Sequence, residues 1–304
     1  MRVKTKHVAE YAILRAVGGL LQALPYRAAL AVACALARLT YAMAGRRVQT
    51  TKARIREVFG DALSAREVDR IAWLSWRNLV FVGVDVLRLP RVTKKWARSV
   101  AKFGPALETL RAHQATGRGA ILVTAHMGSW ELGGTLSSLF GMPIVYVFAD
   151  QKNALFNAYL TKLRTRHGAT GIARGSGSTM KAVVRALKNG GFLAMPVDLR
   201  SPRPGFMVDF LGGRANVRTG TAVMAWLADV PVFPCVSRRI GWSRHEFRVC
   251  APIVCDRTQP KQQAMAQLTQ QVFSVLDEAI RAQPDQWFWY NKRWVLDPLR
   301  EIET

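Results

Sequence analysis

The segment AILVTAHMGSWELGG, residues 120–134, predicts a strand, a turn and a helix in direct succession. Its first part is uncharged and rich in aliphatic side chains, which predicts a buried strand over 120–124. The small residues that follow favour a turn, and Ser129 has the position of an amino-terminal cap for a helix over 129–140. The sequence therefore places His126 at the carboxyl end of a strand, directly before a helix.

The same alternation of strand and helix continues along the chain. Strands separated by helices predict an α/β fold with a mostly parallel central sheet flanked by helices. Sites in such sheets form at the carboxyl ends of strands, which is where His126 is expected. The further strands that we expect are 144–148, 192–197 and 232–236, and the further helices are 153–167, 178–188, 216–228 and 262–282.

His126 and Glu131 have the chemistry of a general base and its partner. Glu131 falls in the first turn of the expected helix, so the turn can bring its carboxylate back toward the imidazole. A carboxylate on one ring nitrogen fixes the tautomer and makes the other nitrogen a better base. The same residues also fit a structural role, in which His126 caps a turn and Glu131 complements the helix dipole.

The amino-terminal part of the chain predicts two helices that are broken at Pro25. Arg15 interrupts the apolar run 8–24, and the wholly apolar run 28–37 ends at Arg38, so both are too short to span a bilayer. We therefore expect these helices to lie in or against a membrane interface. An ordinary helical hairpin packed on the domain is the alternative. We divide the chain into membrane-associating helices (1–45) and a main domain (46–304), which comprises a helical lead-in (46–115) and an α/β core (117–304) that carries His126 and Glu131.

The chain is strongly basic. Among 304 residues, Lys and Arg number 44 and Asp and Glu number 20, which gives a net charge of +24. This excess favours an anionic partner: nucleic acid, an anionic membrane surface, or acidic substrates and carrier proteins. The four cysteines lack the paired spacing of a zinc site. The sequence also has no HExxH, GxSxG, Walker or GxGxxG motif, so no motif argues for a hydrolase or a nucleotide-binding protein.

Several motifs together resemble one family. The segment from His126 to Glu131 is the H-x4-E form of the H-x4-D/E signature of glycerolipid-type acyltransferases. Its surroundings resemble the bacterial late acyltransferases of lipid A biosynthesis, the lauroyl and myristoyl transferases. Later blocks resemble the same family in the same order: a helix and strand that end in Asp198 (180–198), a glycine-terminated element (205–212) and a tryptophan-rich segment (286–294).

The resemblance implies transfer of a fatty acyl group from an acyl carrier protein or coenzyme A thioester to a hydroxyl of a membrane glycolipid. It implies no metal, no cofactor and no covalent enzyme intermediate, with His126 as general base and Glu131 as the group that stabilises the imidazolium. The charge then fits an acidic acyl carrier protein, an anionic lipid A precursor and the cytoplasmic face of the inner membrane. Leu199, Leu211 and Asn291 depart from the family pattern, and these departures bear on the acceptor lipid.

Further residues are candidates for binding substrate. Arg174 precedes an expected helix near the carboxyl edge of the sheet, and Arg174, Arg214 and Arg293 can each hold a phosphate or carboxylate. By its place in the family block, the backbone amide of Gly212 or the guanidinium of Arg214 is a candidate donor to the oxyanion of the reaction. Asp198, which ends an expected strand, either orients a substrate group or an arginine or caps a turn.

Two other functions fit parts of the sequence. The H-x4-E motif specifies chemistry rather than headgroup, so a lysophospholipid or a mannosylated phosphoinositide is an alternative acceptor. A basic nucleic-acid-binding protein without catalysis would need aromatic residues along a basic groove. Here the aromatic residues lie in apolar segments, and we expect Trp287, Trp289 and Trp294 in the core. We therefore expect an enzyme, with no nucleic acid as partner.

Overall fold

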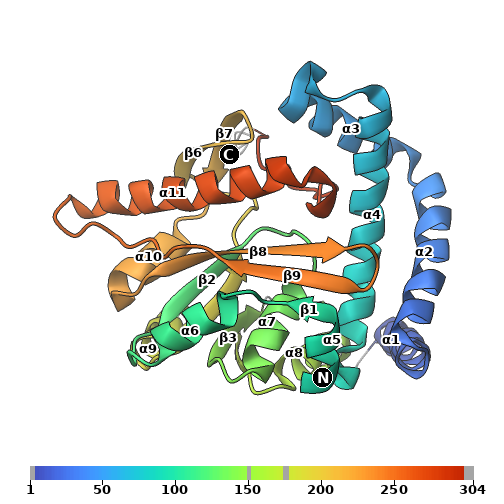
Figure 1. The fold of residues 1–304 in the computed structure, drawn as a ribbon, viewed down its shortest axis with the longest axis horizontal. Coiled ribbons are helices and arrows are strands. Elements are labelled where there is room, and N and C mark those ends of the chain that lie inside the picture. Colours follow the sequence, from blue (N-terminus) through green and yellow to red (C-terminus); the bar gives the residue numbers. More distant parts are fainter. Residues whose placement is uncertain (1–3, 149–151, 174–177, 298–304) are drawn as a thin grey trace.

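A mostly parallel sheet forms the centre of the computed structural model, which describes residues 4–148, 152–173 and 178–297 (Figure 1). Among the described strands, the order in this sheet is β1-β9-β8-β2-β5-β3-β4, and every pair is parallel except β8 with β9. The predicted α/β fold is therefore confirmed. The strands are β1 (Ala101–Lys102), β2 (Ala120–Thr124), β3 (Ile144–Phe148), β4 (Thr170–Ala173), β5 (Phe192–Pro196), β8 (Val232–Ile240) and β9 (Arg244–Val249).

The two faces of the sheet carry different helices because successive strand residues point to opposite sides. Ile121 and Val123 face a large apolar core that includes residues of α9, α10 and α11, whereas Leu122 faces a smaller cluster with Leu110 of α6. The buried Trp287, Trp289 and Trp294 belong to the large core, as predicted. The helices that follow β1 along the chain are α6 (Ala106–Gln114), α7 (Trp130–Leu139), α8 (Ala154–Thr165), α9 (Thr179–Lys188), α10 (Gly220–Ala228) and α11 (Lys261–Ala282).

A separate antiparallel hairpin of β6 (Phe206–Phe210) and β7 (Gly213–Val217) packs on α11. Leu211 and Gly212 join its strands with φ of 53° and 81°, a pair of left-handed residues typical of a two-residue hairpin turn. The helix predicted over 216–228 starts later, at Gly220. The prediction is wrong at its beginning because Asn216 and Val217 pair with β6 across the hairpin, a contact that local sequence does not reveal.

Helix α4 crosses the sheet at the carboxyl end of β8 (Figure 1). It begins with a capping box, in which the Glu67 carboxylate accepts from the Ser64 backbone amide at 2.8 Å and Ser64 Oγ accepts from the Glu67 amide at 3.3 Å. Its buried residues follow a helical period, so one face packs against the rest of the protein. The helices that precede the sheet are α1 (Thr5–Ala23), α2 (Tyr26–Met43), α3 (Gly45–Phe59), α4 (Ala65–Leu87) and α5 (Lys94–Val100), with short 3₁₀ turns at Gly60–Ala62, Leu89–Arg91 and, later, Pro284–Gln286.

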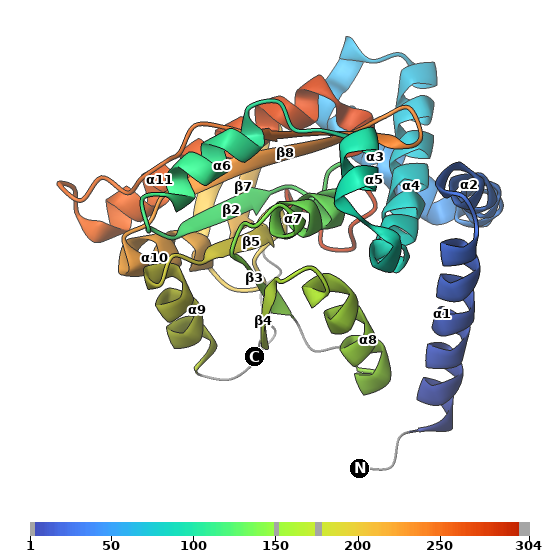
Figure 2. The same ribbon diagram turned by 60° about the horizontal axis from the view of Figure 1, so that its bottom comes forward.

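The first two helices break at Pro25, as predicted, and each leaves one apolar face uncovered. α2 packs on α4, while α1 runs away from the sheet with its amino-terminal end farthest from α2 (Figure 2). Within the described residues no single helix has both the length and the apolarity to cross a bilayer; α2 and the segment that follows it to Ala62 meet these criteria only as a pair bent by 90°. The exposed apolar side chains are Val8, Ile13, Val17 and Leu20 on α1, and Val32, Leu36, Leu39 and Met43 on α2.

Candidate active site

His126 lies in a turn whose backbone is held on several sides. The turn leaves the carboxyl end of β2 and leads into α7, as the sequence predicts. The amide of His126 donates to Asp198 Oδ2 at 2.8 Å, and its carbonyl accepts from the Phe288 amide at 2.9 Å. These bonds fix the direction in which the imidazole leaves the chain.

Gly128 permits this turn to pass close to the neighbouring strand β8. Its φ is +57°, and a Cβ at this position would lie 2.2 Å from the carbonyl oxygen of Ser237. Any side chain would therefore collide with backbone, in addition to the strain of a left-handed conformation. The Gly128 amide also donates to the carbonyl of Gln286 at 2.9 Å. The close approach explains the glycine between His126 and Glu131.

Asp198, not Glu131, holds the imidazole ring. His126 Nδ1 lies 2.6 Å from Asp198 Oδ1, and the Asp198 side chain is 2% exposed. The indole Nε1–H of Trp287 donates to Asp198 Oδ2 at 2.6 Å, so the carboxylate is itself held in place. Because Nδ1 is occupied, Nε2 is the ring nitrogen that can act as a base.

The electrostatics of this pair favour its charged form. Burial opposes the imidazolium, but the charge of Asp198, its hydrogen bond to Nδ1 and the charge of Glu131 together raise the pKa of His126 above its usual value. Burial would also raise the pKa of Asp198, yet the charge of His126 and the hydrogen bonds from His126 and Trp287 hold it below its usual value. Asp198 is therefore an anion beside a ring that binds a proton readily.

The register of the sheet explains why Asp198 reaches His126. β2 and β5 are parallel neighbours, and Thr124 pairs with Pro196. Each strand ends at this pair, and two residues further along the chain come His126 and Asp198. The two side chains therefore emerge next to each other at the same edge. From the sequence, Asp198 is predicted to orient a substrate group or an arginine, or to cap a turn. The signal for its actual partner is that His126 and Asp198 each lie two residues after the end of a predicted strand.

Glu131 contacts an arginine instead of the imidazole, so the expected hydrogen bond between Glu131 and His126 is wrong. Arg164 Nε donates to Glu131 Oε2 at 2.9 Å, and Arg164 Nη2 contacts the other carboxylate oxygen. Arg164 belongs to α8, whose carboxyl-terminal part faces the first turn of α7. A planar guanidinium satisfies both carboxylate oxygens at once, which a single imidazole nitrogen does not. Sequence reasoning missed Arg164 because nothing in its local pattern distinguishes it from other basic residues of the helix.

An apolar cavity of about 370 Å³ lies beside these groups. The cavity lies on the sheet face that carries Leu122 and Ala194, a pair in neighbouring strands, and α6 and α7 border it. His126, Glu131 and Arg164 supply polar groups to its wall. The other lining residues include Phe103, Leu107, Leu110, Leu122, Trp130, Tyr146, Phe148, Ala194, Met195, Cys235, Phe247 and Val249.

Three of the other predicted residues lie in described parts of the chain that do not line this cavity. Gly212 is in the hairpin turn, and Arg214 is an exposed residue 3.6 Å from Asp209, on the hairpin that packs with α11 against the opposite face of the sheet. Arg293 is exposed in the carboxyl-terminal segment. Gly212, Arg214 and Arg293 are not among the described residues that line the cavity. Arg174 lies outside the described residues.

Ser129 occupies the cap position of α7, but its hydroxyl does not cap the helix. Ser129 Oγ donates to Asp85 Oδ2 of α4 at 2.6 Å.

Around the site and elsewhere in the described ranges, no group of three or more His, Cys, Asp or Glu side chains is arranged to hold a metal ion.

Comparison with known proteins agrees with the motifs. A model of the family described as bacterial lipid A biosynthesis acyltransferase matches residues 3–295. The chain is 24% identical over 281 residues to the lipid A biosynthesis lauroyltransferase of Escherichia coli K12, covering 90% of this chain and 88% of that protein. It is 25% identical over 198 residues to the lipid A biosynthesis palmitoleoyltransferase of the same organism, covering 64% and 62%.

A relative with a different printed acceptor also matches. The phosphatidylinositol mannoside acyltransferase of Mycobacterium tuberculosis H37Rv is 24% identical over 219 residues, which cover 70% of this chain. The match spans 66% of the length of that relative, slightly less than two thirds.

Proposed function

This chain belongs to the bacterial lipid A biosynthesis acyltransferase family, and on that basis we propose that it transfers a fatty acyl group from an acyl carrier protein thioester to a hydroxyl of an anionic glycolipid. The observation that carries the proposal is His126, held by Asp198, in the wall of an apolar cavity. A base beside a space for an alkyl chain is what acyl transfer to an alcohol needs.

In this mechanism, Nε2 of His126 accepts the proton of the acceptor hydroxyl. The hydroxyl oxygen forms a bond to the thioester carbonyl carbon, the carbon–sulfur bond breaks, and the proton on His126 passes to the departing thiolate. Asp198 keeps the proton of the neutral ring on Nδ1 and stabilises the imidazolium that forms between the two proton transfers. The products are an ester of the glycolipid and the free thiol of the carrier, so atoms and charge balance.

Glu131 and Arg164 act together in the proposal. Glu131 holds the Arg164 guanidinium at the cavity wall, where its charge can attract a phosphate or the carbonyl oxygen of the donor. The charge of Glu131 also contributes to the raised pKa of His126. Glu131 therefore supports the imidazolium through space, without the direct contact that the sequence predicted.

The cavity is the proposed binding site for the acyl chain. From Leu122 to the end of β2 at Thr124 the strand advances two residues, about 7 Å at the rise of a parallel strand, and His126 follows in the turn. An alkyl chain laid along this face would be covered by Leu107 and Leu110 of α6 and would leave its thioester near the imidazole. Removal of such a chain from water favours binding at about 0.8 kcal/mol per methylene.

The amino-terminal helices are the proposed membrane contact. Their uncovered apolar side chains lie on α1 and α2, and Arg15, Arg27 and Arg38 on the same helices can reach lipid phosphates. With a net charge of +24, the protein would be attracted to the anionic cytoplasmic face of the inner membrane and to an acidic carrier protein.

A mannosylated phosphoinositide is the second candidate acceptor, favoured by the similarity to the mycobacterial enzyme. Both acceptors combine an anionic headgroup with sugar hydroxyls, so the site chemistry described here serves either. The nature of the headgroup therefore has to be decided by experiment.

The test is mass spectrometry of lipids after the purified protein has been incubated with carrier protein loaded with acyl groups of several lengths. A lipid A precursor and a phosphatidylinositol mannoside are offered in separate reactions. We expect a mass increase of one acyl group on one of them, and loss of about 10² to 10⁴ in rate for His126→Ala. His113→Ala, which removes a histidine that bonds the Gly119 carbonyl, is the matched control. Near-normal turnover by His126→Ala, or transfer to neither lipid, would contradict the proposal.

A further inference from the structure

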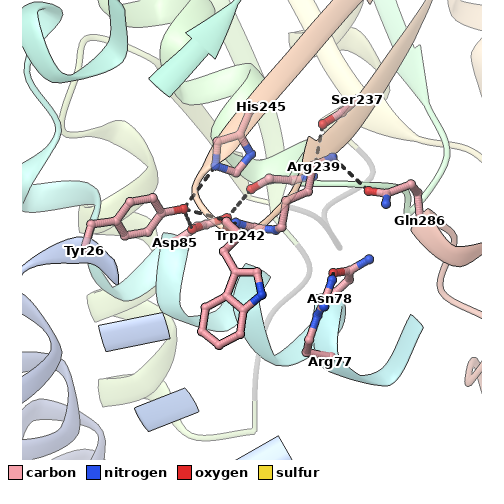
Figure 3. A network of polar contacts seen from close by, with 10 residues as sticks. Tyr26, Arg77, Asn78, Asp85, Ser237, Arg239, Trp242, His245 and Gln286 are labelled. Carbon is pink, nitrogen blue, oxygen red and sulfur yellow. Dashed lines mark hydrogen bonds and ion pairs between the residues drawn. The ribbon is translucent and has the colours of Figure 1, made fainter. Parts of the chain in front are cut away.

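A buried polar cluster lies behind the turn between His126 and Glu131, and it reaches from that turn to the first residue of α2 (Figure 3). Asp85 of α4 is at its centre. Asp85 Oδ2 accepts from the Ser129 hydroxyl at 2.6 Å and pairs with Arg239, and Asp85 Oδ1 accepts from Tyr26 Oη at 2.6 Å. A single carboxylate thus holds the turn of the site, the strand β8 and the helix α2.

The charges of this cluster compensate each other inside the protein. The side chains of Asp85 and Arg239 are 1% and 0% exposed. Burial would raise the pKa of Asp85, but the charge of Arg239 and the hydrogen bonds from Ser129 and Tyr26 hold it below its usual value. Asp85 is therefore a carboxylate, which accepts stronger hydrogen bonds than a neutral group does.

His245 completes the cluster, and the other hydrogen bonds determine which of its ring nitrogens carries the proton. Its Nε2 lies 3.0 Å from Tyr26 Oη. Because the single hydroxyl proton of Tyr26 is donated to Asp85, His245 Nε2 must carry a proton and donate to Tyr26. The other nitrogen, Nδ1, has no hydrogen-bond partner within the described residues, as expected for a neutral ring. Tyr26 therefore has both a donor and an acceptor role, and its position is set by the cluster.

Strand β8 and the segment around Gln286 also hold the turn through hydrogen bonds to its backbone. The Ser129 amide donates to Ser237 Oγ at 3.0 Å. The Arg239 amide donates to Gln286 Oε1 at 2.8 Å, and the carbonyl of Gln286 accepts from Gly128. A shift of Asp85 or Arg239 would therefore displace residues 128 and 129, which lie between the two groups of the site.

We propose that Asp85 is a positioning residue for the site, and that through Asp85 and Ser129 the packing of α2 on α4 sets the position of the turn that carries His126 and Glu131. The consequence for turnover rests on the proposed function; the consequence for the turn does not. Since α2 carries an uncovered apolar face, contact of that helix with lipid would reach the site by this route.

The experiment uses the full chain with Tyr26→Phe, Ser129→Ala and the double variant. Tyr26→Phe keeps the ring and removes the hydroxyl, and Ser129→Ala removes the second hydrogen bond to Asp85. Ser138→Ala is the matched control, because Ser138 is a buried serine of the same helix whose hydroxyl donates to the His167 carbonyl at 2.7 Å, away from the turn. Hydrogen exchange of the amides 126–131 and the kinetics of transfer from lauroyl-loaded carrier protein to a lipid A precursor are measured on each.

We expect Tyr26→Phe to speed exchange of the amides of residues 128 and 129, although Tyr26 is about a hundred positions earlier in the chain. We expect Ser129→Ala to lower kcat about tenfold with little change in KM, the scale of one hydrogen bond to a buried charge. Once Ser129→Ala has cut the link, adding Tyr26→Phe should lower kcat by less than about twofold. Ser138→Ala should leave both the exchange of this turn and kcat near those of the unaltered protein.

Unchanged exchange at residues 128 and 129 in Tyr26→Phe would overturn the link to α2, and so would losses in kcat that multiply in the double variant. Equal losses for Ser129→Ala and Ser138→Ala would overturn the positioning role. If the unaltered protein transfers no acyl group at all, the proposed function fails, and the exchange measurement still decides between a coupled and an uncoupled turn.

Discussion

Replacing Asp198 by asparagine tests the main conclusion about the site with a change of one atom. Asp198 Oδ2 accepts from two donors, the His126 amide and the Trp287 indole, and Asp198 Oδ1 faces His126 Nδ1. In Asp198→Asn the amide oxygen will take the Oδ2 position, because only an oxygen satisfies those two N–H groups. The asparagine NH₂ then faces Nδ1 of the ring.

This orientation sets the size of the effect. A donor opposite Nδ1 makes that nitrogen an acceptor, so the ring proton moves to Nε2 and the base is lost. A carboxylate-to-amide change with this consequence lowers kcat by about 10⁴ in serine proteases. We expect a loss of about 10³ to 10⁴ here, or about 4 to 5 kcal/mol in activation free energy.

The dependence of kcat on pH provides a second, independent test of the contact between Asp198 and His126. In the unaltered protein Asp198 raises the pKa of His126, so activity should rise with pH through a value above the usual one for histidine. Without the carboxylate, burial remains as the main influence on the ring and lowers its pKa. The acidic limb of kcat against pH should therefore move to lower pH in Asp198→Asn while the maximum falls.

The assay compares acyl transfer by Asp198→Asn and Asp277→Asn from pH 5 to 9, with thermal unfolding of both. Asp277 of α11 also accepts a backbone amide, that of Leu211 at 2.7 Å, and pairs with Arg281, but it lies in the part of the fold opposite the cavity. Asp277→Asn should keep near-normal kcat. A kcat for Asp198→Asn within tenfold of the unaltered value, in a folded protein, would refute the assignment of Asp198 as the partner of the imidazole.

Three further changes test other parts of the structure. Glu131→Gln should release Arg164 from its bidentate contact and lower kcat by about tenfold. If the two residues act as a unit, the loss of kcat in Glu131→Gln/Arg164→Gln will be smaller than the product of the two single losses, and losses that multiply would contradict this. Ala194→Phe fills the cavity at one wall and should shift the preferred donor toward shorter acyl chains in a competition between loaded carrier proteins; an unchanged preference would remove the cavity from the proposal. Burial lowers the pKa of His245 to about 4. As the pH falls, His245 therefore binds a proton in the unfolded chain before it does so in the folded protein. The contribution of neutral His245 to the free energy of unfolding is full above pH 6.5 and is lost as the pH drops toward 4. Relative to His245→Gln, this lowers the free energy of unfolding by about 3 kcal/mol between pH 7 and pH 4, measured by denaturant titration, and a pH-independent difference would contradict it.

The strands and helices near the site follow closely from local sequence. The strands predicted over 120–124 and 144–148 are β2 and β3 with the same bounds, because each is a short apolar run between turns. The helix predicted over 216–228 fails at its start, where residues 213–217 pair with another strand. Pairing between segments overrides local preference, and no pattern within one segment reports it.

The contacts of the site were less accessible to sequence reasoning. His126 was identified because it ends a strand and begins a motif, both local properties. The predicted partner, Glu131, is five residues away in the chain, whereas the structure places Asp198, which follows the neighbouring strand, against the imidazole and pairs Glu131 with Arg164. Gly212 and Arg214 were linked to the site by order in the chain alone, and the hairpin carries them to the other face of the sheet.

Local sequence is enough to predict the alternation of strands and helices, the place of His126 at a strand end and the excess of positive charge, because these depend on residue type and spacing along one segment. The carboxylate that faces the imidazole, Asp198, and the residue that anchors the turn behind it, Asp85, are set by the three-dimensional fold. Hydrogen bonds act over about 3 Å, and which atoms come that close depends on the order and register of strands that are distant in sequence.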